Sequence, residues 1–271
     1  MNLKEAYSYS VRFLQGNNVD EADFKALCVC CAVAGIKNSE YSLHINDDII
    51  HSRLAEMLWA LREGEPLQYV IGKWDFYESE FCVGKGVLIP RPETEELVEL
   101  VYNYAKELER PVIIDLCAGS GCIGISLAKK LNSSVYLVEK SKDAFEYLCK
   151  NSRGVENAFP INADINDMID LPKADIIVSN PPYIKSGDLD SLQSEVKREP
   201  KIALDGGMDG LDFYRIINDK WADKLRDFGK LFLEIGNDQG KSINDILINF
   251  KNIRVKKDIY GNDRMVVADK R

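Results

Sequence analysis

Apolar residues follow two different periods along the chain. In the first third they recur every three or four residues, which is the period of an amphipathic helix. Leu3 to Leu14 is one such segment, and Asp20 and Gly35 are typical of the start and end of a second helix. Asn46 is typical of the start of a third helix, with apolar positions at Ile50, Leu54, Met57, Leu58 and Leu61. These patterns predict a small helical bundle over residues 1–73.

From Pro111 onward the period changes. Short β-rich runs, most of them apolar on both faces, alternate with helical patterns, which indicates a parallel sheet covered by helices on both sides. The predicted strands span 112–115, 135–139, 159–163, 176–179 and 230–235. Two more runs, 253–259 and 265–268, are joined only by a tight turn. Since a parallel pair needs a long crossover, the last strand is predicted to run antiparallel.

A third pattern lies between these two parts. Aromatic residues alternate with polar ones from Tyr69 to Val87, and three glycines interrupt them, which predicts a hairpin linker over residues 74–90. The predicted fold class is therefore α/β, with a doubly wound Rossmann-like sheet over residues 91–271 and a small helical bundle at the N-terminus. A length of 271 residues agrees with two structural units.

Composition and charge limit the class of function. Hydrophobic residues make up 45% of the chain and charged residues 29%, as in ordinary globular proteins. A net charge of -9 argues against a surface that neutralises phosphates, so we expect no direct nucleic-acid binding. The chain has no run of about 18 apolar residues, and its first ten residues lack the apolar block of a signal peptide. We therefore expect a cytoplasmic protein without membrane contact.

The seven cysteines show no paired spacing typical of a disulfide framework. Cys28 and Cys31 form one C-x-x-C, and His44 and His51 follow them. The six residues between the histidines exceed the spacing of a zinc finger. Both cysteines also fall on the apolar stripe of the second predicted helix, so we expect buried thiols and no metal site.

A glycine-rich segment follows the first predicted strand of the sheet. Gly119, Gly121 and Gly124 form G-x-G-x-x-G between that strand and a helix, where backbone N–H groups can approach a ligand closely. Glu139 ends the next strand, where its carboxylate can accept hydrogen bonds from both hydroxyls of a ribose. These residues alone fit a dinucleotide as well as an adenosyl-sulfonium cofactor.

Two aspartates favour the sulfonium cofactor. Asp115 at the start of the loop would repel a pyrophosphate and attract an ammonium or sulfonium group. Asp164 ends the third predicted strand and can accept a hydrogen bond from the amine of adenine, while Ile165 can cover the ring. Each aspartate could also be a simple strand-end cap.

The sequence Asn180-Pro181-Pro182-Tyr183 follows the fourth predicted strand. The two prolines stiffen the backbone beyond the strand end, which is where ligands bind in such sheets. The Asn180 side-chain oxygen and the Pro181 backbone oxygen can hold the two N–H bonds of an NH2 group, and Tyr183 can lie against a planar amide. Fixed carbonyl dipoles then stabilise the positive charge that the nitrogen gains during methylation, so no strong base is needed.

Several further segments resemble those of the peptide chain release factor glutamine methyltransferases. They are Glu65 to Gly72, Leu88 to Glu95, the glycine loop, Ser179 to Tyr183, Glu199-Pro200, Leu204 to Gly207, Asp209 to Leu211, and Gly261 to Arg264. The resemblance implies S-adenosylmethionine as cofactor and methylation of the side-chain amide nitrogen (N5) of the glutamine in the Gly-Gly-Gln motif of release factors. It also implies that the helical domain helps to dock this protein partner, and we expect the enzyme to be a monomer.

The residues and the resemblance together give a predicted site. Its catalytic residues are Asn180, Pro181, Pro182 and Tyr183. Its cofactor-binding residues are Asp115, Cys117, Ala118, Gly119, Ser120, Gly121, Glu139, Asp164, Ile165 and Asn180. Leu88 to Thr94 are expected to line the same cavity. The family often has glycine at the position of Cys117, and a cysteine there predicts ordinary backbone angles.

Three other functions remain open from the sequence. The Asn-Pro-Pro-Tyr sequence also occurs in adenine amino-methyltransferases that act on nucleic acid. The glycine motif by itself fits an NAD-dependent oxidoreductase. A noncatalytic binding module of the translation machinery is the third alternative.

Overall fold

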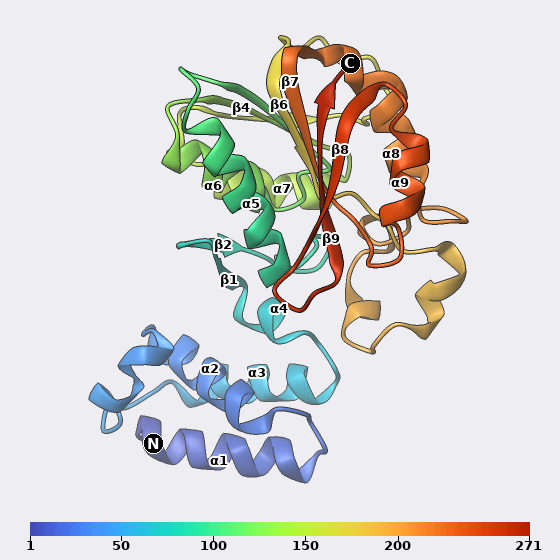
Figure 1. Cartoon of the computed structure of the whole chain (residues 1–271). Helices are drawn as coiled ribbons and strands as arrows, with labels where there is room; N and C mark the ends of the chain where they lie inside the picture. Colours follow the sequence, from blue (N-terminus) through green and yellow to red (C-terminus); the bar gives the residue numbers. More distant parts are fainter. The chain divides into compact units, whose positions relative to one another are not determined.

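The computed structural model describes residues 1–271. The chain forms two compact units, coloured along the sequence in Figure 1. One unit contains Met1–Lys73 together with the short segment Gln193–Arg198. The other contains Trp74–Leu192 and Glu199–Arg271. None of the helices is long and apolar enough to span a membrane.

The first unit is helical. Its helices are α1 (Leu3–Gly16), α2 (Ala22–Ala34), α3 (His51–Arg62) and α4 (Leu67–Ile71), with a 3-10 turn at Asn38–Leu43. Helix α1 begins with a capping box, because Asn2 and Glu5 each accept a hydrogen bond from the other's backbone N–H. Helix α2 ends at Gly35, whose φ of 72° suits glycine.

Two predicted helix starts in this unit are wrong. Asp20 does not cap α2, which begins after Glu21 without a side-chain cap. Asn46 does not cap α3, because the backbone of residues 45–49 hydrogen-bonds to residues 1–4 and is not available for a helix. Helix α3 begins only at His51, and Ile50 before it is 64% exposed instead of lying in the core.

The thiols of α2 are packed inside the first unit. Cys28, Cys30 and Cys31 are buried and free, and burial raises the pKa of Cys31 to about 11. Cys28 accepts a hydrogen bond from Asn38, and His44 contacts Asp47. The structure contains no group of three or more metal-binding side chains.

The second unit contains a seven-stranded sheet in the order β5-β4-β3-β6-β7-β9-β8. The strands are β3 (Val112–Leu116), β4 (Ser134–Glu139), β5 (Ala158–Asn162), β6 (Ala174–Ser179), β7 (Leu225–Glu234), β8 (Phe250–Lys257) and β9 (Asp263–Lys270). The ladders from β5 to β7 are parallel, and β9 runs antiparallel to both of its neighbours. The predicted α/β class and the antiparallel last strand are confirmed.

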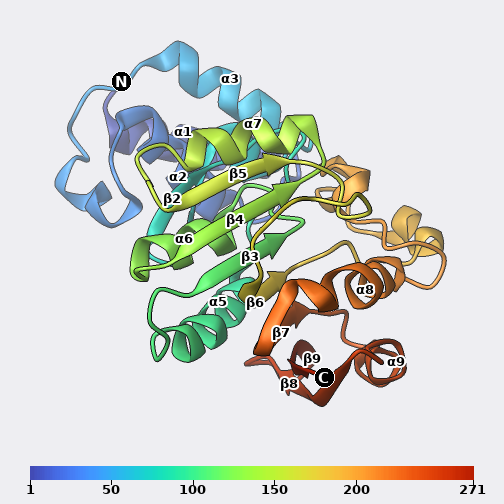
Figure 2. The ribbon, with the colours of Figure 1, turned by 90° about the horizontal axis from the view of Figure 1, so that it is seen from above.

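Helices cover both faces of this sheet, as Figure 2 shows. One face carries α5 (Pro92–Ala105), α6 (Cys122–Lys130) and α7 (Lys142–Asn151). The other carries α8 (Asp212–Ile216), the π-helical turn Ile217–Trp221, the 3-10 turn Ala222–Lys224 and α9 (Gly240–Ile246). Successive strand residues alternate between the faces, since Ile113 packs in one core and Ile114 in the other.

The hairpin β1 (Lys73–Phe76) and β2 (Ser79–Cys82) adds two aromatic residues to the core of the second unit. Phe76 and Phe81 are buried, and their rings meet edge to face with 6.0 Å between centroids. Residues 86–94 then lead to the carboxyl ends of the central strands. Strand order reverses there, because β3 lies between β4 and β6, and this is where doubly wound sheets bind ligands.

Candidate active site

The loop between β3 and α6 has an unusual backbone. Cys117, Gly119 and Gly121 all have positive φ, of 58°, 57° and 81°. The prediction of ordinary backbone angles at Cys117 is therefore wrong, because the chain must turn sharply from the strand into the helix at this position. The left-handed region costs a residue with a Cβ about 1–2 kcal/mol, which explains why glycine suits the position.

Two glycines of the motif are needed for close packing. A Cβ on Gly121 would lie 2.4 Å from Leu148 Cδ1 and 2.6 Å from Ile125 Cδ1. A Cβ on Gly124 would lie 2.8 Å from Leu137 Cδ2 and 2.9 Å from Asp115 Oδ2. Gly124 therefore lets α6 approach the sheet, and Gly121 leaves room for Leu148 of α7 and Ile125 of α6, whereas Gly119 has open space at the same position.

Asp115 lies beneath the loop. It is fully buried, its Oδ2 accepts a hydrogen bond from Gly124 N at 2.9 Å, and its Oδ1 has no hydrogen-bond partner. Burial raises the pKa of this carboxyl to about 8, so it is largely neutral at pH 7. Asp115 does not line the pocket, so its attraction to a positively charged ligand stays a prediction, and in the structure the residue connects β3 to α6.

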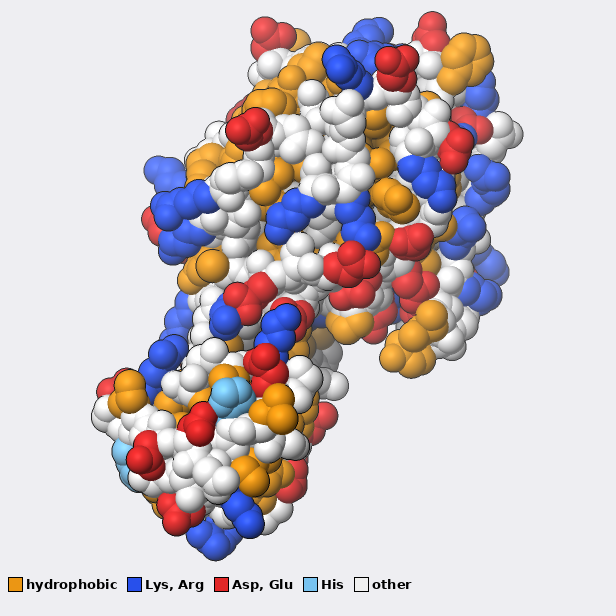
Figure 3. All heavy atoms as spheres, turned by 90° about the vertical axis from the view of Figure 1, so that its left-hand side faces the viewer, with side chains coloured by type: hydrophobic (Ala, Val, Ile, Leu, Met, Phe, Trp, Pro, Cys, Tyr) orange, Lys and Arg blue, Asp and Glu red, His pale blue; other side chains and the backbone are white.

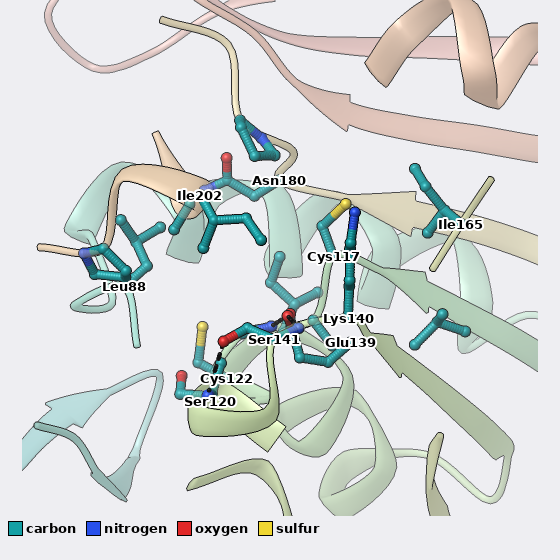
Figure 4. Close-up of a pocket in the computed structure, with 18 of the residues that line it drawn as sticks. Leu88, Cys117, Ser120, Cys122, Glu139, Lys140, Ser141, Ile165, Asn180 and Ile202 are labelled. Atoms are coloured by element: carbon teal, nitrogen blue, oxygen red, sulfur yellow. Dashed lines mark hydrogen bonds between the residues drawn. The ribbon is translucent and has the colours of Figure 1, made fainter. Parts of the chain in front are cut away.

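A pocket opens at the carboxyl ends of β3, β4 and β6, and Figure 4 shows part of its lining. Eight of the predicted cofactor residues line it: Cys117, Ala118, Gly119, Ser120, Glu139, Asp164, Ile165 and Asn180. The other two, Asp115 and Gly121, do not. Among the predicted catalytic residues, Asn180 and Pro182 line the pocket, and Pro181 and Tyr183 do not.

Glu139 holds the loop between β3 and α6, on the side of the pocket where the cofactor is predicted to bind. Its Oε2 accepts a hydrogen bond from Gly119 N at 2.8 Å, and its Oε1 accepts one from Ser141 N at 2.7 Å. Burial raises the pKa of this carboxyl, against the opposing effect of these backbone N–H donors. The carboxylate is thus fixed by main-chain groups at the place where the sequence predicts a contact with ribose.

Asp164 is engaged by neighbours in this structure. Its Oδ2 lies 2.7 Å from Lys140 Nζ, and its Oδ1 accepts a hydrogen bond from Asn166 N at 2.9 Å. Partial burial would raise the pKa of Asp164, but the bonds to Lys140 and Asn166 outweigh it and lower the pKa. The neighbouring Ile165 is 3% exposed and forms an apolar part of the pocket wall.

The opposite side of the pocket depends on a chain of side-chain hydrogen bonds. Asn180 Nδ2 donates to Thr94 Oγ1 at 3.1 Å, and Thr94 Oγ1 donates to Glu234 Oε2 at 2.7 Å. Tyr183 OH donates to Glu234 Oε1 at 3.3 Å, so Tyr183 does not face the pocket where a planar amide was expected. Arg264 Nη1 lies 3.5 Å from the same hydroxyl.

The main chain of Pro182 and Tyr183 is held by residues that do not line the pocket. A Cβ on Gly206 would lie 2.7 Å from Tyr183 Cα, and one on Gly210 would lie 2.4 Å from Tyr183 O. Gln239 Nε2 donates to the backbone oxygens of both Tyr183 and Gly210. The glycines of the segment 204–211 therefore permit a backbone contact that fixes the Asn-Pro-Pro-Tyr turn.

The segment 88–94 completes the wall, as the sequence predicts. Leu88, Pro90, Arg91 and Thr94 line the pocket, together with Pro200, Ile202 and Ala203 of the facing loop. The buried carboxylate of Glu199 joins the two segments, since it accepts hydrogen bonds from Ile89 N and from the Arg91 guanidinium. In Figure 4, Leu88, Ile202 and Asn180 lie across the pocket from Glu139 and Ser141.

Sequence reasoning missed Glu234 as a site residue and gave Thr94 no individual role. Glu234 lies near the end of a strand that is otherwise apolar from Leu231 to Ile235, and it is 1% exposed. A single carboxylate in such a run is the signal that could have identified it, because a buried charge requires partners.

Comparisons with known proteins show which family the chain resembles. The model "PrmC N-terminal domain" matches residues 5–72, and the model "Conserved hypothetical protein 95" matches residues 82–207. A release factor glutamine methyltransferase of Thermodesulfovibrio yellowstonii is 39% identical over 248 residues, covering 87% of this chain and 88% of that protein. One of Moorella thermoacetica is 33% identical over 282 residues, covering 100% of this chain and 99% of that protein.

The chain belongs to the release factor glutamine methyltransferase family. It is therefore a methyltransferase, and the resemblance seen in its motifs is confirmed. Among solved structures, M. jannaschii TYW2 in complex with AdoMet has 21% sequence identity and a TM-score of 0.49, covering 73% of this chain and 84% of that chain.

Proposed function

We propose that this methyltransferase transfers a methyl group from S-adenosylmethionine to the side-chain amide nitrogen of the glutamine in the Gly-Gly-Gln motif of release factors. The observation that carries the proposal is the hydrogen bond from Asn180 Nδ2 to Thr94. Because the amide nitrogen is engaged with Thr94, the carbonyl oxygen of Asn180 is left as a hydrogen-bond acceptor at the pocket wall. The names of the relatives supply the substrate class.

The pocket residues fit the cofactor. Gly119 has open space where a Cβ would be, which leaves room for a ligand against the loop. Glu139 offers a carboxylate held by main-chain donors, and Ile165 offers an apolar surface for a ring. When bound, S-adenosylmethionine supplies the methyl group that is transferred.

The chemistry that the chain must perform is to position a weak nucleophile. The nitrogen lone pair of an amide is delocalised, so the nitrogen is a poor nucleophile and must be held close to the methyl group and turned toward it. As the N–CH3 bond forms the S–CH3 bond breaks, S-adenosylhomocysteine is left, and the nitrogen then releases one of its two protons to water. Asn180 Oδ1, at the pocket wall, is the acceptor that we assign to one of its N–H bonds, and Pro181 O, although Pro181 does not itself line the pocket, is the acceptor that the sequence predicts for the other. Such positioning can contribute about 7 kcal/mol to lowering the barrier, and the carbonyl dipoles stabilise the charge that develops on nitrogen.

The direct test uses purified enzyme, S-adenosylmethionine with a labelled methyl group, and a bacterial release factor. Label should appear on the glutamine of the Gly-Gly-Gln motif, located by mass spectrometry of the peptide. A release factor with that glutamine changed to alanine is the matched control and should remain unlabelled. An unlabelled wild-type factor would contradict the substrate assignment.

The adenine amino-methyltransferase alternative is tested in the same assay. Figure 3 shows basic side chains interspersed with acidic ones on the visible face of each unit, and the chain carries a net charge of -9. Neither feature favours phosphate binding. Transfer of label to DNA or RNA instead of the release factor would make that alternative the better assignment.

A further inference from the structure

We propose that Glu234 is a positioning residue that fixes, through Thr94, which way the side-chain amide of Asn180 faces. Glu234 does not line the pocket, and its carboxylate is joined to Asn180 only through the Thr94 hydroxyl. The consequence for catalysis rests on the proposed function. The orientation of the Asn180 amide does not depend on that function and can be tested without a substrate.

The direction of the hydrogen bonds follows from counting protons. An ionised carboxylate only accepts hydrogen bonds, so Thr94 must donate its single hydroxyl proton to Glu234 at 2.7 Å. The Thr94 oxygen can then only accept from its other neighbour, which must therefore present an N–H group. Asn180 accordingly turns its Nδ2 toward Thr94, at 3.1 Å, and its Oδ1 the other way.

This orientation decides whether Asn180 can hold the substrate. A glutamine NH2 group has two donors and needs acceptors. With Oδ1 directed toward the substrate, Asn180 provides one. With the amide turned round, its own NH2 would face the NH2 of the substrate, and the two donors would repel each other.

The same carboxylate also holds the other end of the Asn-Pro-Pro-Tyr turn. Tyr183 OH donates to Glu234 Oε1 at 3.3 Å, and Arg264 lies beside that hydroxyl. Both ends of the turn are thus held by hydrogen bonds to Glu234, one directly and one through Thr94, although Glu234 is 54 residues beyond Asn180 in the sequence.

The arrangement requires the ionised form of Glu234. Burial raises the pKa of this carboxyl, and Glu93 acts in the same direction, while Thr94, Arg264 and Tyr183 lower it. A protonated Glu234 could donate to Thr94, which would then donate to Asn180 and reverse the amide. We therefore expect kcat to fall as the pH is lowered, and this acid limb should be lost in Glu234→Gln, because an amide does not titrate.

The main test compares Thr94→Val with Thr94→Ser. Valine keeps the shape of threonine but has no hydroxyl, so kcat for release-factor methylation should fall about 10- to 100-fold. The dissociation constant for S-adenosylmethionine, measured by calorimetry, should change less than about threefold. Serine retains the hydroxyl and should recover most of the loss. Ser126→Ala, which removes a buried hydroxyl without a hydrogen-bond partner, is the control and should keep the wild-type kcat.

A second measurement tests the network without any substrate. With asparagine labelled with nitrogen-15, the exchange of the Asn180 side-chain amide protons with water should be slow in the wild type and faster in Thr94→Val. Unchanged exchange, or a Thr94→Val kcat within twofold of the wild type, would overturn the inference. If wild-type enzyme methylates no release factor, the proposed function fails, while the exchange measurement still tests the hydrogen bond from Asn180 Nδ2 to Thr94.

Discussion

The two sides of the pocket are built from different parts of the polypeptide. On the cofactor side, main-chain geometry dominates, with positive φ at Cys117 and Gly119 and a backbone N–H of Gly119 that holds Glu139. On the acceptor side, a chain of side chains dominates, running from Asn180 through Thr94 to Glu234. The first arrangement tolerates changes of side chain that leave the backbone path intact, whereas the second fails when a single hydrogen-bonding group is lost.

Asn180→Ala should break the acceptor side and leave the cofactor side intact. Loss of the acceptor oxygen should lower kcat about 100- to 1000-fold, as for other oriented polar groups in active sites. The dissociation constant for S-adenosylmethionine should change only a few-fold, because the loop 117–121 is untouched. Steady-state kinetics and calorimetry measure the two quantities. Asn103→Ala, an exposed amide on α5, is the control, and an Asn180→Ala enzyme with kcat within tenfold of the wild type would contradict the comparison.

Gly206→Ala should disturb the acceptor side through the backbone. The new Cβ would lie 2.7 Å from Tyr183 Cα and 2.8 Å from Pro182 O, so the turn must shift. We expect a loss of about 1–3 kcal/mol in the free energy of unfolding and a kcat about tenfold lower. Gly187→Ala is the matched control, since a Cβ there meets nothing within 4 Å. Equal unfolding free energies and rates for the two variants would show that the contact behind Tyr183 does not fix the turn.

The two sides of the pocket differ in how far the sequence could predict them. The cofactor side is local, because strand, glycine loop, helix and Glu139 follow one another within residues 112–139, and their spacing alone indicates the arrangement. Cys117 was the exception, since its positive φ is imposed by the path of the chain and not by its own preference. The antiparallel direction of β9 was predictable for the same reason, because only a tight turn joins it to β8, whereas the order of the strands in the sheet was not predicted.

The acceptor side was only partly predictable, because its hydrogen bonds join distant positions. Thr94 and Glu234 are 140 residues apart, and Asn180 and Thr94 are 86 apart. The motif identified Asn180, but not which way its amide faces, nor that Tyr183 contacts Glu234. In the first unit, the wrong start at Asn46 has a similar cause, since pairing with residues 1–4 overrides the local signal.

Asp115→Asn should change how the stability of the cofactor side depends on pH. A folded-state pKa of about 8, above the usual value of 3.8, means that the folded protein holds a proton that the unfolded chain has lost. The stability from this proton is fully present below about pH 4 and declines as the pH rises toward 8. The slope is up to about 1.4 kcal/mol per pH unit. Asparagine removes this slope while keeping the acceptor for Gly124 N.

Chemical unfolding at pH 5, 6, 7 and 8 measures the effect of Asp115→Asn. The raised pKa values of Glu139 and Glu234 are present in both proteins, so the difference between the two slopes isolates Asp115. Parallel slopes would mean that Asp115 is ionised in the folded protein, and an attraction to a positively charged ligand would again be reasonable.

Cys117→Gly should have the smallest effect and is the sharpest test of main-chain control. Glycine removes the cost of about 1–2 kcal/mol that a residue with a Cβ has in the left-handed region. Loss of the partly buried thiol costs a similar amount of stability, so the two effects nearly cancel. The free energy of unfolding should therefore change by less than about 1 kcal/mol, and cofactor affinity by less than about threefold. Cys117→Val, with a branched Cβ at the same φ, should be clearly less stable. If Cys117→Gly instead binds S-adenosylmethionine more than tenfold more weakly, the thiol itself contacts the ligand, and the cofactor side depends on side chains as the acceptor side does.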